Sequence, residues 1–136
     1  MKTHLLLAAA ALLVATSLPL PAVQAQEVSL GDIKRIDLVR NDLSVPGREV
    51  IQALIEFGPG VSAARHSHPG EEIVYVLKGT LEYRLDGQPP SRLSRGDVLF
   101  IPYGVPHSVR NVGTVPAIEI ATYLVTKGKP LIEAVD

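Results

Sequence analysis

The 136-residue sequence contains no cysteine. Without cysteine the chain can form no disulfide, no thiolate metal site and no cysteine nucleophile, so its core alone must stabilise the fold. It also has little excess charge, with 13 basic against 14 acidic residues and no basic stripe. We therefore expect neither nucleic acid nor an anionic lipid surface as a partner.

After the first 25 residues, the sequence lacks any segment with a sustained apolar period of 3.6 residues. Short runs rich in Val, Ile, Leu and Tyr recur instead, separated by glycine and proline. This pattern predicts an all-β, single-domain antiparallel barrel or sandwich. Residues 126–136 show no clear pattern and are interpreted as a tail or as a segment that packs on a partner subunit. The predicted strands cover residues 33–39, 50–57, 61–68, 72–78, 80–85, 91–93, 98–101, 107–111 and 117–125.

The only long apolar run is at the beginning of the chain. Lys2 precedes an unbroken run of Leu, Ala and Val over residues 5–15, and Val23 and Ala25 place small residues before a cleavage point. This pattern predicts a Sec-type signal peptide over residues 1–25 and an exported, periplasmic or secreted domain over residues 26–136. Because the run is shorter than the ~20 residues that span a bilayer, no membrane anchor is expected after cleavage. Loss of Lys2 leaves 12 basic against 14 acidic residues and changes the formal charge from −1 to −2.

Three of the four histidines lie in two short segments, and the fourth, His4, lies in the predicted signal peptide. His66 and His68 form an H-x-H pair, and His107 follows in a second segment bounded by glycine and proline. Side chains two residues apart on a strand point to the same face, about 6.6 Å apart along the chain. Neutral imidazoles and carboxylates are ligands that divalent first-row metals bind. The pattern therefore predicts a metal site.

Two glutamates follow the H-x-H pair, and the geometry of the turn decides which of them joins the site. If residues 69–71 form a three-residue hairpin loop, His68 pairs with Glu72 and the Glu72 carboxylate shares the histidine face. A two-residue loop would deliver Glu71 instead. Strand alternation alone leaves both glutamates open, and it places Arg65 and Arg110 on the face away from the ligands.

The two segments match a known family pattern. The chain resembles a small single-domain cupin, whose motifs are G-x5-H-x-H-x3-E-x6-G and G-x5-P-x-G-x2-H-x3-N. The resemblance implies a cupin-type jelly roll and a metal site formed by three histidines and Glu72, so it selects Glu72 over Glu71. Asn111 is interpreted as a strand or turn residue rather than as a ligand. The residues that fill the defined positions are Gly60, His66, His68, Glu72 and Gly79, then Gly96, Pro102, Gly104, His107 and Asn111.

Three imidazoles and one carboxylate leave coordination positions open, as a catalytic metal requires. The leading interpretation is a metal-dependent oxygenase for a small phenolic or dicarbonyl compound, with Glu72 acting as a base as well as a ligand. The alternatives are a non-catalytic module that binds a small molecule, a purely structural metal site, and a cupin isomerase or epimerase, since the resemblance implies all of them. No further acid–base group is evident near the motifs, and Tyr83 is expected to pack rather than react.

Export has a consequence for the metal. Without a twin-arginine signal, the chain should cross the membrane unfolded and bind its ion afterwards. The Irving–Williams order then favours zinc or copper, whereas protein folded in the cytosol would take up iron, nickel or manganese. A homodimer is also expected, from the fold resemblance and from apolar strand residues near 50–57, because small open barrels cover edges and apolar faces with a second subunit.

Overall fold

A computed structural model describes residues 27–30 and 33–136. The predicted signal peptide lies outside these residues and stays a prediction. Within the described ranges, no helix is long and apolar enough to cross a membrane. These residues form the strands β1 (Glu27–Leu30), β2 (Ile33–Asp42), β3 (Arg48–Phe57), β4 (Ser62–Ser67), β5 (Gly70–Lys78), β6 (Thr80–Leu85), β7 (Ser91–Ser94), β8 (Val98–Ile101), β9 (His107–Asn111), β10 (Ala117–Thr126) and β11 (Glu133–Ala134).

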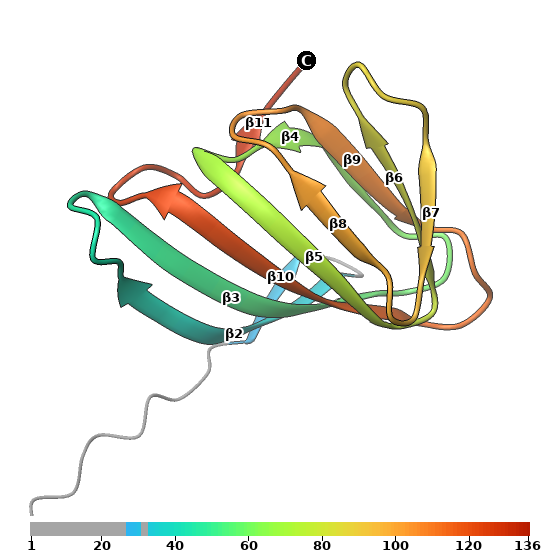
Figure 1. The fold of residues 1–136 in the computed structure, drawn as a ribbon. Coiled ribbons are helices and arrows are strands. Elements are labelled where there is room, and N and C mark those ends of the chain that lie inside the picture. The colour runs from blue at the N-terminus through green and yellow to red at the C-terminus, as the bar shows by residue number, and fades with distance from the viewer. Residues whose placement is uncertain (1–26, 31–32) are drawn as a thin grey trace, which may run out of the picture.

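The strands build two antiparallel sheets that face each other across one core (Figure 1). The larger sheet has the order β1-β2-β3-β10-β5-β8, and the smaller one has the order β11-β4-β9-β6-β7. The long strands β3 and β10 pair along their whole length, from Phe57 opposite Ala117 to Arg48 opposite Thr126. The predicted all-β antiparallel jelly roll is confirmed.

The predicted strands correspond to β2 through β10, and their ends agree within three residues. The first and last strands in the chain, β1 and β11, were not predicted. In β11, Glu133 lies opposite Ser67 and Ala134 lies opposite His66. Part of the segment 126–136 therefore belongs to the sheet of its own chain, where two paired residues are too few to produce an alternating sequence pattern.

The hairpin considered between residues 61–68 and 72–78 is wrong. Strand β4 pairs with β9 and β11 in the smaller sheet, whereas β5 pairs with β10 and β8 in the larger one. The chain crosses from one sheet to the other at Pro69, so neither hairpin loop exists. Gly70 permits the close approach, because a Cβ atom at this position would collide with the carbonyl oxygen of Leu124 in β10. Glu72 still reaches the interior that His68 faces, because the inner faces of both sheets share one core.

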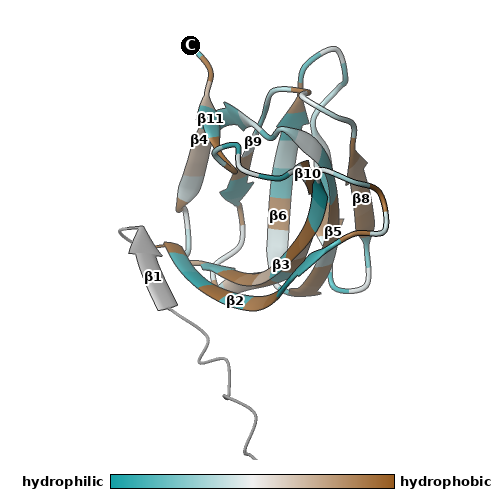
Figure 2. Cartoon of the chain, turned by 90° about the vertical axis from the view of Figure 1, so that its left-hand side faces the viewer, coloured by the Kyte–Doolittle hydropathy of each residue, from teal (hydrophilic) through white to brown (hydrophobic). Residues whose placement is uncertain are grey.

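Alternate side chains of the facing strands fill this core. Figure 2 shows the alternating polar and apolar bands along β2 and β3. In β5, Val74 and Val76 are fully buried, whereas Ile73 and Tyr75 are exposed, as strand alternation predicts. Facing the same core are Ile51, Ala53, Ile55 and Phe57 of β3 and Ala117, Ala121, Tyr123 and Val125 of β10.

Exposed apolar side chains gather on β5 and β8 rather than on β3. Ile73 lies opposite Phe100, and Tyr75 lies opposite Val98. Their exposed fractions run from 37% to 58%, whereas every residue of β3 is buried or half-buried. The apolar residues near 50–57 therefore do not supply the surface from which a homodimer was expected. The homodimer itself stays a prediction.

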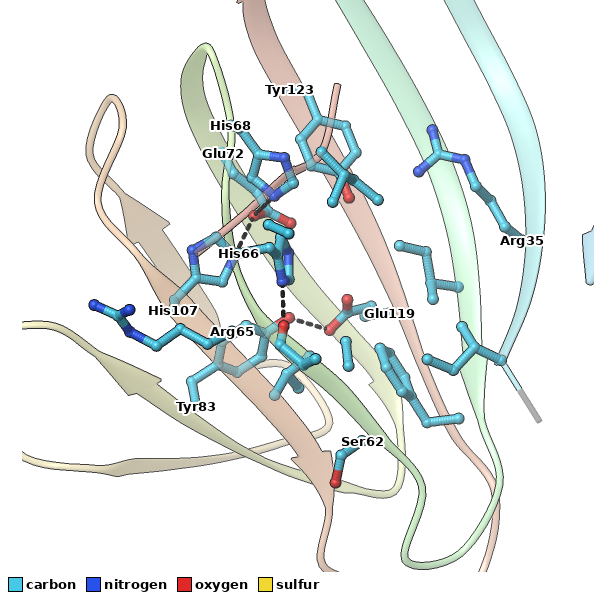
Figure 3. Close-up of a pocket in the computed structure, with 18 residues that line it drawn as sticks. Arg35, Ser62, Arg65, His66, His68, Glu72, Tyr83, His107, Glu119 and Tyr123 are labelled. Atoms are coloured by element: carbon cyan, nitrogen blue, oxygen red, sulfur yellow. Dashed lines mark hydrogen bonds and ion pairs between the residues drawn. The ribbon is translucent and has the colours of Figure 1, made fainter. Parts of the chain in front are cut away.

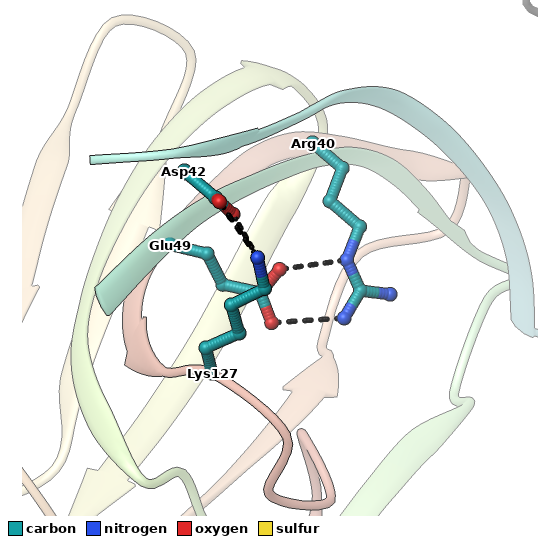
Figure 4. A network of polar contacts seen from close by, with 4 residues as sticks. All are labelled: Arg40, Asp42, Glu49 and Lys127. Carbon is teal, nitrogen blue, oxygen red and sulfur yellow. Dashed lines mark hydrogen bonds and ion pairs between the residues drawn. The ribbon is translucent and has the colours of Figure 1, made fainter. Parts of the chain in front are cut away.

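Charged side chains form two ion pairs at one end of the larger sheet (Figure 4). Glu49 of β3 is 3% exposed, and its carboxylate accepts hydrogen bonds of 2.8 Å from both Nε and Nη2 of Arg40 in β2. The hydrogen bond from Arg40 lowers the pKa of Glu49 below its usual range. Beside this pair, Nζ of Lys127 lies 2.6 Å from both carboxylate oxygens of Asp42, but these two side chains are more than half exposed.

Removing either carboxylate of this network should show how much more the buried ion pair stabilises the fold than the exposed one. Glu49→Ala is expected to lower the free energy of unfolding by about 1–2 kcal/mol, because it deletes two charge-assisted hydrogen bonds at a covered carboxylate. Asp42→Ala is the matched control and should change that free energy by less than about 0.5 kcal/mol. Urea unfolding followed by circular dichroism measures both values. Equal losses in the two variants would contradict the difference assigned to burial.

Candidate metal centre

Both sheets contribute to a cluster of imidazoles and one carboxylate in the core (Figure 3). His66 of β4 lies opposite His107, the first residue of β9, while His68 directly follows β4 and Glu72 lies in β5. The ligand nitrogens of the three histidines lie within 4.8 Å of one another. Oε2 of Glu72 is 3.1 Å from Nε2 of His68 and 3.3 Å from Nε2 of His107. The fold thus brings together all four residues predicted as ligands.

Backbone carbonyls fix the orientation of each imidazole. A carbonyl oxygen only accepts hydrogen bonds, so each Nδ1 carries a proton, and in the neutral ring Nε2 keeps a free lone pair. This arrangement is the usual one around metal-binding histidines. The pairs are His66 Nδ1 with Ala64 O at 2.6 Å, His68 Nδ1 with Leu131 O at 2.6 Å, and His107 Nδ1 with Val105 O at 3.0 Å.

The segment that follows β10 takes part in this arrangement. Leu131 supplies the carbonyl that holds His68, while Ile132 and Ala134 line the cavity beside the histidines. Residues 126–136 thus form part of the site wall. Their role leaves little trace in the sequence, because any residue type can provide a backbone carbonyl.

Two polar atoms at the centre of the cluster are buried without a hydrogen-bond partner. They are Nε2 of His68 and Oε2 of Glu72, which lie 3.1 Å apart but have no proton between them when the His68 ring is neutral. Leaving such an atom unsatisfied costs about 1–3 kcal/mol, and a bound cation would remove that cost. Imidazole nitrogens and a carboxylate directed at one point are a donor set that suits a divalent metal. The three-histidine cluster is therefore compatible with a metal ion.

The protonation states also suit a cation. Burial would raise the pKa of Glu72, but the neighbouring His107 and His68 outweigh this effect and lower that pKa to about 2. Burial lowers the pKa of His66 below its usual value. For His107, burial acts in the same direction, but the nearby Glu72 carboxylate outweighs it and raises the pKa. Near neutral pH the cluster contains a charged carboxylate and a neutral His66, the forms that bind metal.

A second buried carboxyl group lies in the same cavity and was not among the predicted site residues. Glu119 of β10 is 1% exposed and accepts a 2.7 Å hydrogen bond from the hydroxyl group of Tyr83 in β6. Burial, reinforced by the charge of Glu72, raises the pKa of Glu119 to about 8, so this carboxyl group is protonated at neutral pH. Its sequence signal is strand alternation, because Glu119 stands at an inward position of β10. Tyr83, expected only to pack, is part of this hydrogen-bonded pair.

The remaining polar residues of the two motifs lie outside the cluster. Glu71 forms a 2.6 Å ion pair with Arg48, away from the histidines. Arg110 is exposed, as strand alternation predicts. Asn111 is fully buried and has the structural role expected of it. Its side chain donates to the carbonyl oxygens of Phe57 and Val115 and accepts a hydrogen bond from the backbone N–H of Gly113.

The cluster opens onto a cavity of about 290 Å³. Its walls are largely apolar, with Ile55, Phe57 and Val109 among them, and they also include Glu119 and Arg35. Arg65, expected to face away, also lines this cavity, while its guanidinium is held by Asp86. A concave, mostly apolar cavity with a few convergent polar groups is typical of a small-molecule site.

Residues 53–127 match a family model described as Cupin domain. The chain is 49% identical over 45 residues to dimethylsulfoniopropionate lyase DddQ of Ruegeria pomeroyi, which covers 33% of this chain and 22% of the lyase. It is 39% identical over 64 residues to tetracenomycin polyketide synthase protein TcmJ of Streptomyces glaucescens, with coverage of 46% and 42%. The chain thus spans less than half the length of either relative.

Solved structures show the same fold. The crystal structure of DddQ from Ruegeria pomeroyi superposes with a TM-score of 0.56 and 30% identity, covering 60% of this chain and 41% of that chain. An RmlC-like cupin from Shewanella frigidimarina gives a TM-score of 0.61 at 23% identity, covering 77% of this chain and 87% of that chain. The second likeness shows the fold alone.

Proposed function

We propose that this chain, which belongs to the cupin domain family, is a metal-dependent enzyme for a small organic molecule. One observation carries this proposal. Three histidines, each oriented by a backbone carbonyl, meet one charged carboxylate, and two buried atoms of this cluster have no hydrogen-bond partner. One divalent transition metal would be bound by the Nε2 atoms of His66, His68 and His107 together with the carboxylate of Glu72. We infer that the domain works outside the cytoplasm, because residues 1–25 have the pattern of a signal peptide.

The residues of the cavity would divide the chemistry among them. A metal bound by the four ligands supplies a Lewis acid for an oxygen-bearing substrate. In the metal-free cluster Glu72 is charged and Glu119 is protonated. Glu72 would accept a proton on releasing the metal, and Glu119 would donate one. Tyr83 fixes one oxygen of Glu119 through its hydroxyl group. Two carboxyl groups whose pKa values are driven apart by their surroundings are suited to opposite roles in proton transfer.

The leading reaction is oxygenation of a phenolic or dicarbonyl compound, because a four-ligand site keeps coordination positions open. A second candidate is elimination or isomerisation, which needs proton transfer and no dioxygen. The Glu119–Tyr83 pair specifically favours this second candidate, because it adds a proton donor to the cavity. The relative DddQ, named as a lyase, supports it as well.

Single substitutions test the ligand set. His66→Ala, His68→Ala and His107→Ala are each expected to lower the metal content about tenfold or more, since each removes one donor nitrogen. Glu71→Ala is the control and should leave the metal content unchanged, because its carboxylate pairs with Arg48 instead. Elemental analysis of protein recovered from the export compartment measures these contents, and the wild type should contain zinc or copper. Full occupancy in the His107→Ala protein would contradict the four-ligand site.

Turnover with and without dioxygen distinguishes the two reaction classes. An oxygenase should consume dioxygen in proportion to product when given catechol or a 1,3-dicarbonyl, and His107→Ala should abolish this uptake. An eliminating or isomerising enzyme should instead turn over under nitrogen, and Glu119→Gln should slow it about 100-fold, as expected on loss of a general acid. An oxygen electrode and proton NMR measure the two reactions. Stoichiometric binding of catechol or the 1,3-dicarbonyl without dioxygen uptake would contradict the oxygenase assignment.

A further inference from the structure

One arginine lies at the end of the cavity away from the histidines. Arg35 of β2 lines the cavity, and its side chain is only 13% exposed. Its guanidinium lies over the ring of Tyr123, 5.6 Å from the ring centroid. On its other side, the Tyr123 ring packs against His68 at a centroid distance of 4.8 Å. Figure 3 shows Arg35 across Tyr123 from the histidine cluster.

The charge of Arg35 is only partly neutralised. Its Nε donates a 2.8 Å hydrogen bond to Asp37, and the side chain of that aspartate is 50% exposed. Within residues 33–136, no other carboxylate pairs with this guanidinium. Its two terminal amino groups therefore have no carboxylate partner in that range, and the Tyr123 hydroxyl group lies beside them. A guanidinium that is largely shielded from water binds a carboxylate tightly, because parallel N–H groups match the two carboxylate oxygens.

The other charges of the cavity also favour an anion. The carboxyl groups that line it are Glu72, at the histidine end, and Glu119. A divalent ion on the four ligands would offset the charges of both, and Arg35 then leaves the balance inside the cavity positive. The apolar side chains of Ile55 and Phe57 lie in the same cavity and can contact a carbon framework. Electrostatic attraction between largely apolar walls is stronger than in bulk water.

We propose that the cavity takes a small organic acid, which places a metal-binding oxygen at the histidine cluster and its carboxylate at Arg35. This inference rests on the proposed function and narrows its substrate class. It assigns Arg35 to substrate specificity, and it places the carbon framework of the acid beside Glu119. A neutral molecule of the same shape should bind weakly, because it would leave Arg35 without its anion.

A matched pair of ligands tests this assignment. The probes are 3,4-dihydroxybenzoate, which has two metal-binding oxygens opposite a carboxylate, and its uncharged amide. Calorimetry on the zinc-loaded protein should show that the acid binds at least about tenfold more tightly than the amide. In Arg35→Gln this preference should disappear through loss of affinity for the acid, while affinity for the amide changes little. Arg35→Lys should keep part of the preference, because it retains the charge without the planar fork.

Arg65→Gln is the control at the same cavity, because the Arg65 guanidinium is already held by Asp86. It should leave the preference for the acid intact. Equal affinities for acid and amide in the zinc-loaded wild type would overturn the organic-acid assignment and leave the metal site standing. A preference that survives Arg35→Gln, or that Arg65→Gln removes, would also overturn it. Failure of the wild type to retain zinc, measured in the same samples, would overturn the proposed function along with this inference.

Discussion

The backbone carbonyls of Ala64, Val105 and Leu131 each accept a hydrogen bond from the Nδ1 of one histidine. Everything else at the site depends on this constraint, because it directs three Nε2 lone pairs to the position that the Glu72 carboxylate also faces. An apolar core tolerates such a concentration of polar groups only when each has a partner. The protein supplies partners for the outer nitrogens of the imidazoles and leaves the inner atoms of His68 and Glu72 without one.

The fold supplies these carbonyls from separate parts of the chain. Ala64 lies in β4, Val105 precedes β9, and Leu131 follows β10. Each of them lies only a few residues from a point where the chain passes from one sheet to the other. The paired inner faces hold the backbone in place, so the imidazoles are oriented before any ligand arrives. Preorganisation of this kind reduces the entropy lost on binding.

Much of this architecture could be predicted from the sequence, because polar and apolar residues alternate along the strands. A period of two puts Val74 and Val76 on one face of β5 and Ile73 on the other, and the structure buries the first two and exposes the third. The pairing of β4 and β5 could not be predicted in this way, because alternation says which face a side chain occupies but not which strand is its neighbour. Only long-range packing places those two strands in different sheets.

The four clustered residues were found through two short motifs, whereas the rest of the cavity was missed. Glu119 and Arg35 come from strands outside the motifs, and no spacing rule connects them with the histidines. A charged residue at an inward strand position was the available signal for Glu119. For Leu131 there was no signal, since only its carbonyl takes part. The motifs thus reveal the side chains that lie within them, but not the groups that other strands bring to the same cavity.

The interaction on which this account depends can be observed without an assigned substrate. Nitrogen-15 NMR of the imidazoles, recorded on metal-free protein at pH 8, reports which nitrogen of each ring carries the proton. We expect His66, His68 and His107 all to be protonated at Nδ1, and their Nε2 resonances to shift together when one equivalent of zinc is added. An Nδ1 without its proton in any of the three, or resonances that zinc leaves unchanged, would contradict this orientation.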